Sequence, residues 1–284
     1  MNRPESTSQK QIPSLIKEDS SEWSCQNGVW IKKVKSSESI SFPLESYNSE
    51  SYTETYWSRA RANIILRVCH KYNVENLLEI GAGNGLVSIP LSKHGVKVTA
   101  LEPIIEGAQC LAENEIEAIC GTLDSIKSSS YKFSAVGIFD VLEHIGNTKA
   151  FLESITNLLD KNGLLIISVP SHKWLFSDFD SAIGHFRRYS KKSLRQELNE
   201  ANYVEIEIRH AFATLVAPAF ILRRLPYLFG RRRKYAGTKG VEESSKRLVK
   251  VNKFIDMFLY WLLEIESKIK FPFGLSIIAV FKKS

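Results

Sequence analysis

The sequence predicts an α/β protein in which a parallel sheet carries helices on both faces. Two observations support this prediction. Apolar, strand-like runs alternate with helical segments along most of the chain, and this alternation is typical of parallel sheets. In addition, Leu77–Ile80 enters a turn with glycines at 81, 83 and 85, and the apolar run Lys97–Leu101 follows a helical segment and ends at Glu102. A glycine turn at the carboxyl end of a strand is where open α/β sheets bind ligands.

The other elements follow from local patterns. A helix is expected near Thr53–Tyr72, before the first strand, and Ser190 can cap a helix that runs to about Ala201. Further strands are expected at Glu117–Cys120, Ala135–Phe139, Leu164–Val169, Tyr203–Arg209 and Leu275–Phe281.

Composition divides the chain into four parts. They are a polar leader that is expected to be partly disordered (1–50), the core of the fold (51–210), a helical insert (211–272) and the last strand (273–284). The insert holds two apolar stretches, Ala211–Phe229 and Phe254–Ile265, and the basic cluster Arg231–Lys234 between them. Neither stretch has the ~18 uninterrupted apolar residues of a membrane-spanning helix. This pattern suits a cap packed on the sheet or a helix lying in a membrane interface.

The overall composition describes an ordinary globular protein, with 24% charged and 44% hydrophobic residues. The four cysteines, Cys25, Cys69, Cys110 and Cys120, have no C-x-x-C spacing, so they predict reduced thiols and neither a disulfide framework nor a zinc site. The N-terminus lacks the apolar core of a signal peptide, and we therefore expect the protein in the cytoplasm. The formal net charge of +7 would suit nucleic acid, but no nucleic-acid-binding pattern is present, so this partner is not expected.

The glycine turn carries two carboxylates that indicate the ligand. Glu102 at the end of the second strand can accept both hydrogen bonds of a ribose diol. Glu79, two residues before the first glycine, would repel a pyrophosphate but suits a cation that carries an ammonium and a sulfonium. Leu86 occupies the position of the third glycine in the dinucleotide pattern. A cationic ligand that contains a nucleoside is therefore expected.

Four segments resemble a known family. Glu79–Gly85, together with Glu102, closely resembles motif I of the class I S-adenosylmethionine-dependent methyltransferases. Asp140–His144 resembles the D-V-L-E-H signature of many bacterial members. Gly184–Ser190 resembles the G-H-x-R-R-Y-[ST] element of a subgroup often associated with cell-surface glycan and lipid-linked pathways, and Tyr56–Arg61 resembles the helix that precedes motif I in that subgroup.

The resemblance covers roughly residues 57–203 and implies a Rossmann-like, seven-stranded sheet whose last strand is antiparallel to its neighbours. It implies S-adenosylmethionine as the cofactor. Glu79 and the glycines would hold its amino-acid end, Glu102 its ribose, and residues 122–123 its adenine, while Asp140 would face the methyl group. The implied cofactor-binding residues are Glu79, Gly81, Ala82, Gly83, Gly85, Glu102, Thr122, Leu123 and Asp140.

The acceptor side of the site is expected to contain a base. An oxygen acceptor must lose a proton, and a histidine with a pKa of about 6.5 is a suitable base. His144 and His185 are the candidates, and Asp140 is the third expected catalytic residue. The residues expected to form an acceptor-binding lid are Arg187, Arg188 and Tyr189, because paired arginines can bind a phosphate or carboxylate.

A metal site is an alternative for the same segment, although the main interpretation contains no metal. Ubiquinone-biosynthesis O-methyltransferases resemble this segment in an E-x-x-E-H version, and that group has metal-dependent members. The resemblance therefore offers Asp140, Glu143 and His144 as ligands of a divalent cation.

The resemblance implies an O-methyltransferase that acts on a sugar- or isoprenoid-linked intermediate at the cytoplasmic membrane face. Its partners would be a small or lipid-linked acceptor and an anionic membrane surface. Two alternatives stay open. One is a methyltransferase of a soluble or quinone-like metabolite, in which the insert only covers the pocket. The other is a catalytically idle scaffold that binds S-adenosylmethionine and recruits a partner through the insert.

Overall fold

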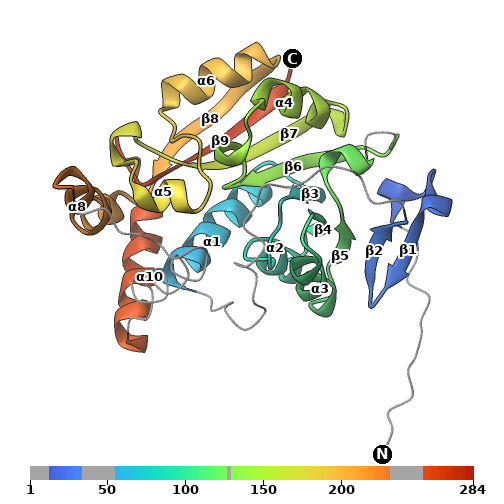
Figure 1. Ribbon diagram of the computed structural model, residues 1–284, viewed down its shortest axis with the longest axis horizontal. Coiled ribbons are helices and arrows are strands. Elements are labelled where there is room, and N and C mark those ends of the chain that lie inside the picture. The colour runs from blue at the N-terminus through green and yellow to red at the C-terminus, as the bar shows by residue number, and fades with distance from the viewer. Residues whose placement is uncertain (1–12, 34–54, 127–128, 231–251) are drawn as a thin grey trace, which may run out of the picture.

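The computed structural model describes residues 13–33, 55–126, 129–230 and 252–284. They form a nine-stranded sheet in the order β1-β2-β5-β4-β3-β6-β7-β9-β8 (Figure 1). The strands are β1 (Trp23–Gln26), β2 (Val29–Lys32), β3 (Asn76–Ile80), β4 (Lys97–Glu102), β5 (Glu117–Cys120), β6 (Phe133–Phe139), β7 (Leu159–Pro170), β8 (Tyr203–Ala211) and β9 (Ser276–Lys283).

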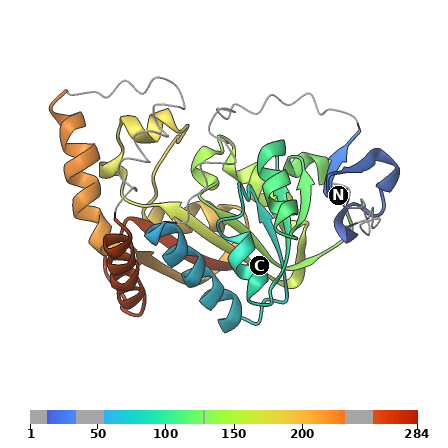
Figure 2. The same cartoon turned by 90° about the horizontal axis from the view of Figure 1, so that it is seen from below.

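Helices cover both faces of the sheet, as the alternating sequence pattern predicts (Figures 1 and 2). One face carries α1 (Tyr56–Lys71), α2 (Ser88–Lys93) and α3 (Ile105–Glu113). The other carries α4 (Thr148–Thr156) and α6 (Lys191–Glu200). The remaining helices are α5 (Asp178–Ala182), α7 (Val216–Ala219), α8 (Leu225–Leu228) and α10 (Lys253–Ser267), with a π-helical turn η9 (Phe220–Arg224) between α7 and α8.

The pairing of the strands confirms the expected topology. The five strands of the central order β5-β4-β3-β6-β7 pair in parallel. The last strand, β9, lies antiparallel between β7 and β8, with Ile166 opposite Val280 and Ile208 opposite Ala279.

The expected count of seven strands is wrong, because a hairpin extends the sheet at its β5 edge. Within residues 1–50, for which the sequence predicts a polar leader, β1 and β2 pair antiparallel, and Val29 of β2 pairs in parallel with Ala118 of β5. Trp23 and Val29 are buried, which ties the hairpin to the core. A short covering hairpin of this kind protects an edge that would otherwise present unpaired backbone groups.

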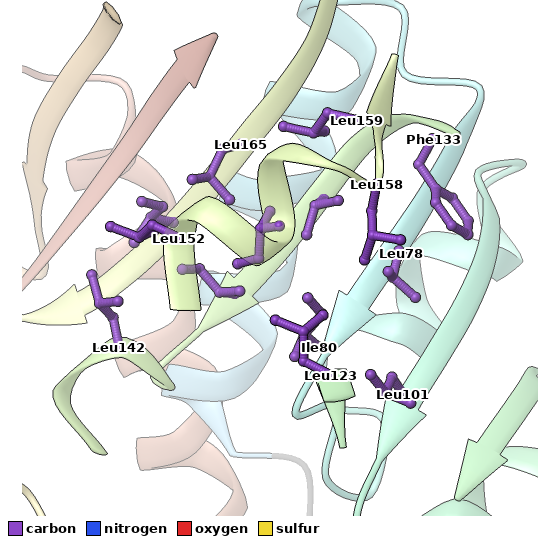
Figure 3. Close-up of a cluster of buried hydrophobic side chains, with 14 of the residues drawn as sticks. Leu78, Ile80, Leu101, Leu123, Phe133, Leu142, Leu152, Leu158, Leu159 and Leu165 are labelled. Atoms are coloured by element: carbon purple, nitrogen blue, oxygen red, sulfur yellow. The ribbon is translucent and has the colours of Figure 1, made fainter. Parts of the chain in front are cut away.

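Two large apolar clusters, one on each face, hold the layers together. The cluster beneath α4 and α6 contains Leu152 and Leu165, both fully buried, and Figure 3 shows their side chains between the helix and the strands. The cluster beneath α1 to α3 contains Ile65, Leu91 and Leu111. The sheet is therefore apolar on both faces, which is characteristic of parallel strands buried between helices.

The insert leaves and rejoins the sheet at the edge where the parallel strands end. It follows the last residue of β8, Ala211, and returns at Ser276, which pairs with both Ala211 and Pro170 at the end of β7. This is the edge at which the glycine turn after β3 lies. The described part of the insert is helical, as predicted, whereas the basic cluster Arg231–Lys234 lies outside the described residues.

We expect Leu152→Ala to destabilise the fold by about 2–5 kcal/mol, because the lost side chain leaves a cavity between α4 and the sheet. Leu228→Ala is the matched control, since Leu228 is 55% exposed and its truncation should cost within about 0.5 kcal/mol. Urea unfolding followed by circular dichroism measures both variants. Equal midpoints for the two variants would contradict the placement of α4 on the sheet.

Candidate functional site

The glycine turn after β3 requires a backbone that only glycine adopts easily. Gly81, Gly83 and Gly85 have φ values of +71°, +57° and +85°. A Cβ at Gly81 would lie 2.8 Å from the Val141 side chain, and one at Gly85 would lie 2.8 Å from Ile89 and Leu111. The turn therefore brings its backbone close to the surrounding elements and to the space above the sheet. Ala82 within it is buried.

Glu102 connects the glycine turn to the end of β4. Its carboxylate accepts hydrogen bonds from the backbone N–H of Gly83 at 2.7 Å and from that of Ile104 at 2.9 Å. Burial raises the pKa of Glu102 to about 7, although both N–H donors act to lower it. A carboxylate fixed in this way at a strand end can accept further hydrogen bonds from the hydroxyls of a ligand.

Glu79 lies at the end of β3 and is buried beside the turn. The Ser88 hydroxyl at the start of α2 donates a hydrogen bond to it. Burial raises the pKa of Glu79 to about 7, while Ser88 and the nearby Arg61 act in the opposite direction. A buried carboxylate with an elevated pKa is a suitable partner for a cationic group of a ligand, because the ligand's charge would favour the ionised form.

Thr122 and Leu123 follow β5 on the far side of Glu102, where the adenine of the cofactor was expected. The Thr122 hydroxyl is buried and has no hydrogen-bond partner among the described residues. Leu123 is buried in the apolar cluster of this face. The Thr122 hydroxyl can form a hydrogen bond with the edge of a nucleobase, and the apolar Leu123 can pack against its face.

Asp140 is held by an arginine that the sequence interpretation did not assign to the site. Arg61 of α1 is buried and forms an ion pair with Asp140, whose other oxygen accepts a hydrogen bond from Ser168 at 3.1 Å. The Arg61 guanidinium also lies over the Trp57 ring, 4.5 Å from its centroid. The sequence feature that could have indicated Arg61 is its position four residues after Trp57, because this spacing places both side chains on one face of α1.

Glu143, His144 and His185 come together although they lie up to 42 positions apart in the chain. Glu143 and His144 are in the turn after β6, and His185 comes from the loop before α6. The two imidazole rings meet edge to face with centroids 4.7 Å apart, and Nε2 of His185 lies 3.7 Å from a Glu143 oxygen. Both candidate bases therefore lie in one place, at the end of β6.

The environments of these three groups differ. Burial and the neighbouring His185 lower the pKa of His144 to about 4, so His144 is neutral at physiological pH. Burial, followed by the charge of Asp140, raises the pKa of Glu143 well above its ordinary value. Neither Glu143 oxygen has a hydrogen-bond partner among the described residues, which is unusual for a buried carboxyl.

The same cluster could hold a divalent cation. Glu143, His144 and His185 each offer a ligand atom, and these atoms lie within 4.8 Å of one another. The ligand set that we considered from the sequence differs, because Asp140 is engaged by Arg61 and His185 occupies the third place. One carboxylate and two imidazoles are ligands that suit several transition metals.

Asp180 orients His185, and no sequence signal indicated this role. Its carboxylate lies 3.0 Å from Nδ1 of His185 and accepts a hydrogen bond from Nε of Arg188 at 2.6 Å. Burial raises the pKa of Asp180, but His185 and Arg188 outweigh this effect and the net shift is downward. Asp180 is thus an ionised carboxylate that fixes the ring of His185 from the side opposite Glu143.

The expected lid residues divide between the interior and the surface. Arg188 and Tyr189, for which an acceptor contact is expected from the sequence, are buried. Arg188 bonds to Asp180 and to the carbonyl of Ser171, and Tyr189 packs in the apolar cluster beneath α6. Arg187 is half-buried and reaches Glu197 and the Gly146 carbonyl. The loop gave no periodicity from which these orientations could be predicted.

Buried polar atoms without a partner gather around this edge of the sheet. Among the described residues they include Nε1 of Trp57, Nε of Arg61, the Thr122 hydroxyl and both oxygens of Glu143. Donors near Glu79 and Asp140 and a hydroxyl near Glu102 fit a ligand with a carboxylate, an ammonium, a ribose and a base. The residues present therefore fit S-adenosylmethionine.

Comparison with known proteins agrees with this geometry. The model of a methyltransferase domain family matches residues 50–208, more than half of the chain. A ubiquinone biosynthesis O-methyltransferase of Rickettsia akari (strain Hartford) is 30% identical over 115 residues, which are 37% of this chain and 45% of that protein. The chain thus matches less than half the length of this relative.

Solved structures share the fold. A methyltransferase of Thermotoga maritima has a TM-score of 0.50 at 14% identity and covers 81% of this chain and 90% of its own. Coclaurine N-methyltransferase, bound to N-methylheliamine and SAH, has a TM-score of 0.52 at 12% identity and covers 84% and 75%. With the family match across the glycine turn and both acids, the chain belongs to the S-adenosylmethionine-dependent methyltransferases.

Proposed function

We propose that the chain methylates an oxygen of a sugar- or isoprenoid-linked intermediate at the cytoplasmic face of the membrane. The observation that carries this proposal is the cluster of His185, His144 and Glu143 at the end of β6, beside an insert with exposed apolar side chains. An oxygen acceptor needs a base, which the cluster supplies, and a lipid-linked acceptor needs an apolar approach to the site, which the insert supplies.

The cofactor would lie along the carboxyl edge of β3, β4 and β6. Glu79 and the glycine turn would hold its amino-acid end, with Arg61 and Trp57 as donors to its carboxylate. Glu102 would accept hydrogen bonds from its ribose hydroxyls, and Thr122 and Leu123 would contact its adenine. This assignment gives a partner to the buried polar atoms of Trp57, Arg61 and Thr122 that have none within the described chain.

His185 is the base that the geometry favours. Asp180 holds it through Nδ1, which leaves Nε2 on the side of Glu143 and the end of β6. His144 is a weaker candidate, because its low pKa makes it a poor proton acceptor. Arg187 is the one lid residue of the three that is partly exposed, and in this proposal it contacts the acceptor.

The bound cofactor supplies a methyl carbon on a positively charged sulfur, which departs as a neutral thioether. Nε2 of His185 takes the proton of the acceptor hydroxyl. The acceptor oxygen would then be the nucleophile toward the methyl group that the cofactor supplies. The ionised Asp180 stabilises the imidazolium that results, and Asp140, fixed by Arg61 and Ser168, shapes the space that the methyl carbon enters. Alignment of this kind can lower a barrier by roughly 7–11 kcal/mol.

A second candidate is the methylation of a soluble, quinone-like acceptor. It is favoured by the similarity to ubiquinone biosynthesis O-methyltransferases. In that case the insert would cover the pocket without contacting a membrane, and a divalent cation at Glu143, His144 and His185 would replace the base.

Glu102→Gln should weaken the binding of S-adenosylmethionine about 10–100-fold, because hydrogen bonds to a charged group are each worth about 1.5–3 kcal/mol. The matched control is Glu106→Gln, which removes an exposed carboxylate from the neighbouring helix α3 and should leave affinity unchanged. Titration calorimetry measures both. Unchanged affinity in Glu102→Gln would remove Glu102 from the ribose site.

Affinity for S-adenosylmethionine should rise by about tenfold per carboxylate between pH 6 and pH 8. The pKa values of Glu79 and Glu102 are both raised to about 7, so both groups are mostly protonated at pH 6 and ionised at pH 8. Only the ionised forms attract the ammonium or accept two ribose hydrogen bonds. The folding stability of the protein without cofactor should change in the opposite direction and fall as the pH rises. Carboxyls with raised pKa values stabilise the fold below about pH 4.5, and this contribution is lost as the pH rises through 7. Calorimetry across this range that shows constant affinity would contradict the assignment.

His185→Ala should lower methyl transfer by about 10²–10⁴-fold and leave cofactor affinity within about twofold. The assay follows tritium from the methyl-labelled cofactor into a total lipid extract of cells that carry the gene, with a short-chain hydroquinone as the second acceptor. His70→Ala, an exposed histidine on α1, is the control. Full activity of His185→Ala would exclude His185 as the base. If the parent methylates the hydroquinone and loses this activity in EDTA, the second candidate function is favoured.

A further inference from the structure

Helix α10 presents an apolar stripe to solvent. Phe254, Phe258, Trp261 and Ile265 follow one another at spacings of three or four residues and so lie on one face of the helix. Phe254 is 77% exposed, and Phe258 and Trp261 are each 58% exposed. Met257 widens the stripe at its edge. Large contiguous apolar surfaces of this kind mark sites of association.

The acidic residues of α10 are all turned away from this stripe. Asp256 pairs with Arg59 of α1, Glu264 pairs with Arg67 of α1, and Glu266 accepts hydrogen bonds from the backbone N–H groups of Ala213 and Thr214. The bases that flank the helix are exposed, and they are Lys253 at its start and Lys268 and Lys270 beyond its end. Exposed lysines thus flank the helix, whereas its acidic side chains are paired within the fold.

A second apolar surface lies at the same end of the molecule. Figures 1 and 2 both place α8 and α10 at the end away from the β1–β2 hairpin. In the α7–η9–α8 segment, Ile221, Leu228 and Phe229 are 56%, 55% and 76% exposed. The sequence between α8 and α10, residues 231–251, contains eight lysines or arginines and two glutamates. The sequence of the insert therefore combines many basic residues with the segments that carry exposed apolar side chains.

The positive charge of the insert distinguishes between two possible partners of this surface, a second copy of the chain and an anionic bilayer. A second copy of the chain would bring two strongly basic inserts together, and like charges brought into contact oppose association. An anionic bilayer would instead neutralise them while its acyl region receives the aromatic side chains. Within the described residues, no helix is long and apolar enough to cross a membrane. A helix with this stripe lies in the plane of the interface.

We propose that the outward face of α10, with the exposed side chains of α7–η9–α8, docks on an anionic phospholipid bilayer. The inference deepens the proposed function and rests on its lipid-linked acceptor. The sequence pattern already includes Phe254–Ile265 in the insert, and the structure adds that α10 packs on α1 with one face and exposes its apolar side chains on the other.

The docking surface is connected to the proposed cofactor site through contacts of α1. Beside the ion pairs of Asp256 and Glu264, Asn63 of α1 donates a hydrogen bond to the Tyr260 hydroxyl at 2.7 Å. Arg59 contacts α10, and Arg61, two residues later, contacts Asp140 in the site. Docking of α10 therefore sets the orientation of the active-site edge relative to the bilayer.

The test is co-sedimentation of the full chain with vesicles of phosphatidylcholine alone or with 30% phosphatidylglycerol. The parent should bind only the anionic vesicles and release as salt rises. Phe258→Ser/Trp261→Ser should lower the partition coefficient by roughly 100-fold, since two large apolar side chains no longer leave water. Lys253→Ser/Lys268→Ser should lower it about fivefold per residue. The matched control, Val204→Ser/Ile206→Ser on β8, removes two exposed apolar side chains elsewhere and should bind like the parent.

A conservative substitution at Trp261 provides a test that does not depend on the folding of the double variant. Brominated lipid should quench the fluorescence of the parent and should quench that of Trp261→Phe much less. Equal partitioning of Phe258→Ser/Trp261→Ser and the control overturns the proposal. A parental dimer in sedimentation equilibrium that becomes monomeric in that variant, without vesicle binding, assigns the surface to a second copy and also overturns it.

Failure of docking and failure of the proposed function give different results. Calorimetric binding of S-adenosylhomocysteine and tritium transfer to lipid extract in detergent test the function without a bilayer. If both persist while vesicle binding is absent, the docking surface is wrong and the function stands. If vesicle binding follows the predicted order while transfer fails, the docking surface stands and the function is wrong.

Discussion

The hydrogen bond from the Gly83 N–H to the Glu102 carboxylate joins the two strands on which the site is built. It connects the turn after β3 to the end of β4, and a second bond to Ile104 fixes the start of the connection to α3. Helix α3 can pack there because residue 107 is glycine, whose added Cβ would lie 2.9 Å from the Gly83 carbonyl. The turn, the acid and the helix are therefore mutually dependent.

Several buried polar atoms at the site have no hydrogen-bond partner among the described residues. Buried donors and acceptors without partners cost free energy, about 1–3 kcal/mol for each, so few are expected in a stable core. Among the described residues they include Trp57 and Arg61 of α1, Thr122 after β5 and Glu143 after β6, around one edge of the sheet. Their common location is explained if the missing partners are groups of the cofactor and the acceptor. Structural groups such as Arg188 and Asp180 are, by contrast, fully engaged with each other.

The cofactor side of the site could be predicted from the sequence to a greater extent than the acceptor side. Glu79, Glu102 and Asp140 each end a strand, and parallel strands bring their carboxyl ends to one edge, so their grouping follows from chain order. Arg188 and Tyr189 lie in a loop without periodicity, and their burial depends on Asp180 and on the core beneath α6. Arg61 and Asp180 were missed because their partners, Asp140 and His185, come from other elements.

The sequence by itself determined the alternation of strands and helices, the positive-φ glycine turn and the acids at the strand ends, because each depends on neighbouring residues alone. Only the tertiary structure decided that residues 23–32 extend the sheet, since Val29 needs the edge of β5 as its partner. It also decided that His185 meets Glu143 and His144, and that α10 turns Asp256 and Glu264 inward to α1 and its aromatic residues outward. These contacts join residues far apart in the chain, whose pairing depends on the packing of the whole fold.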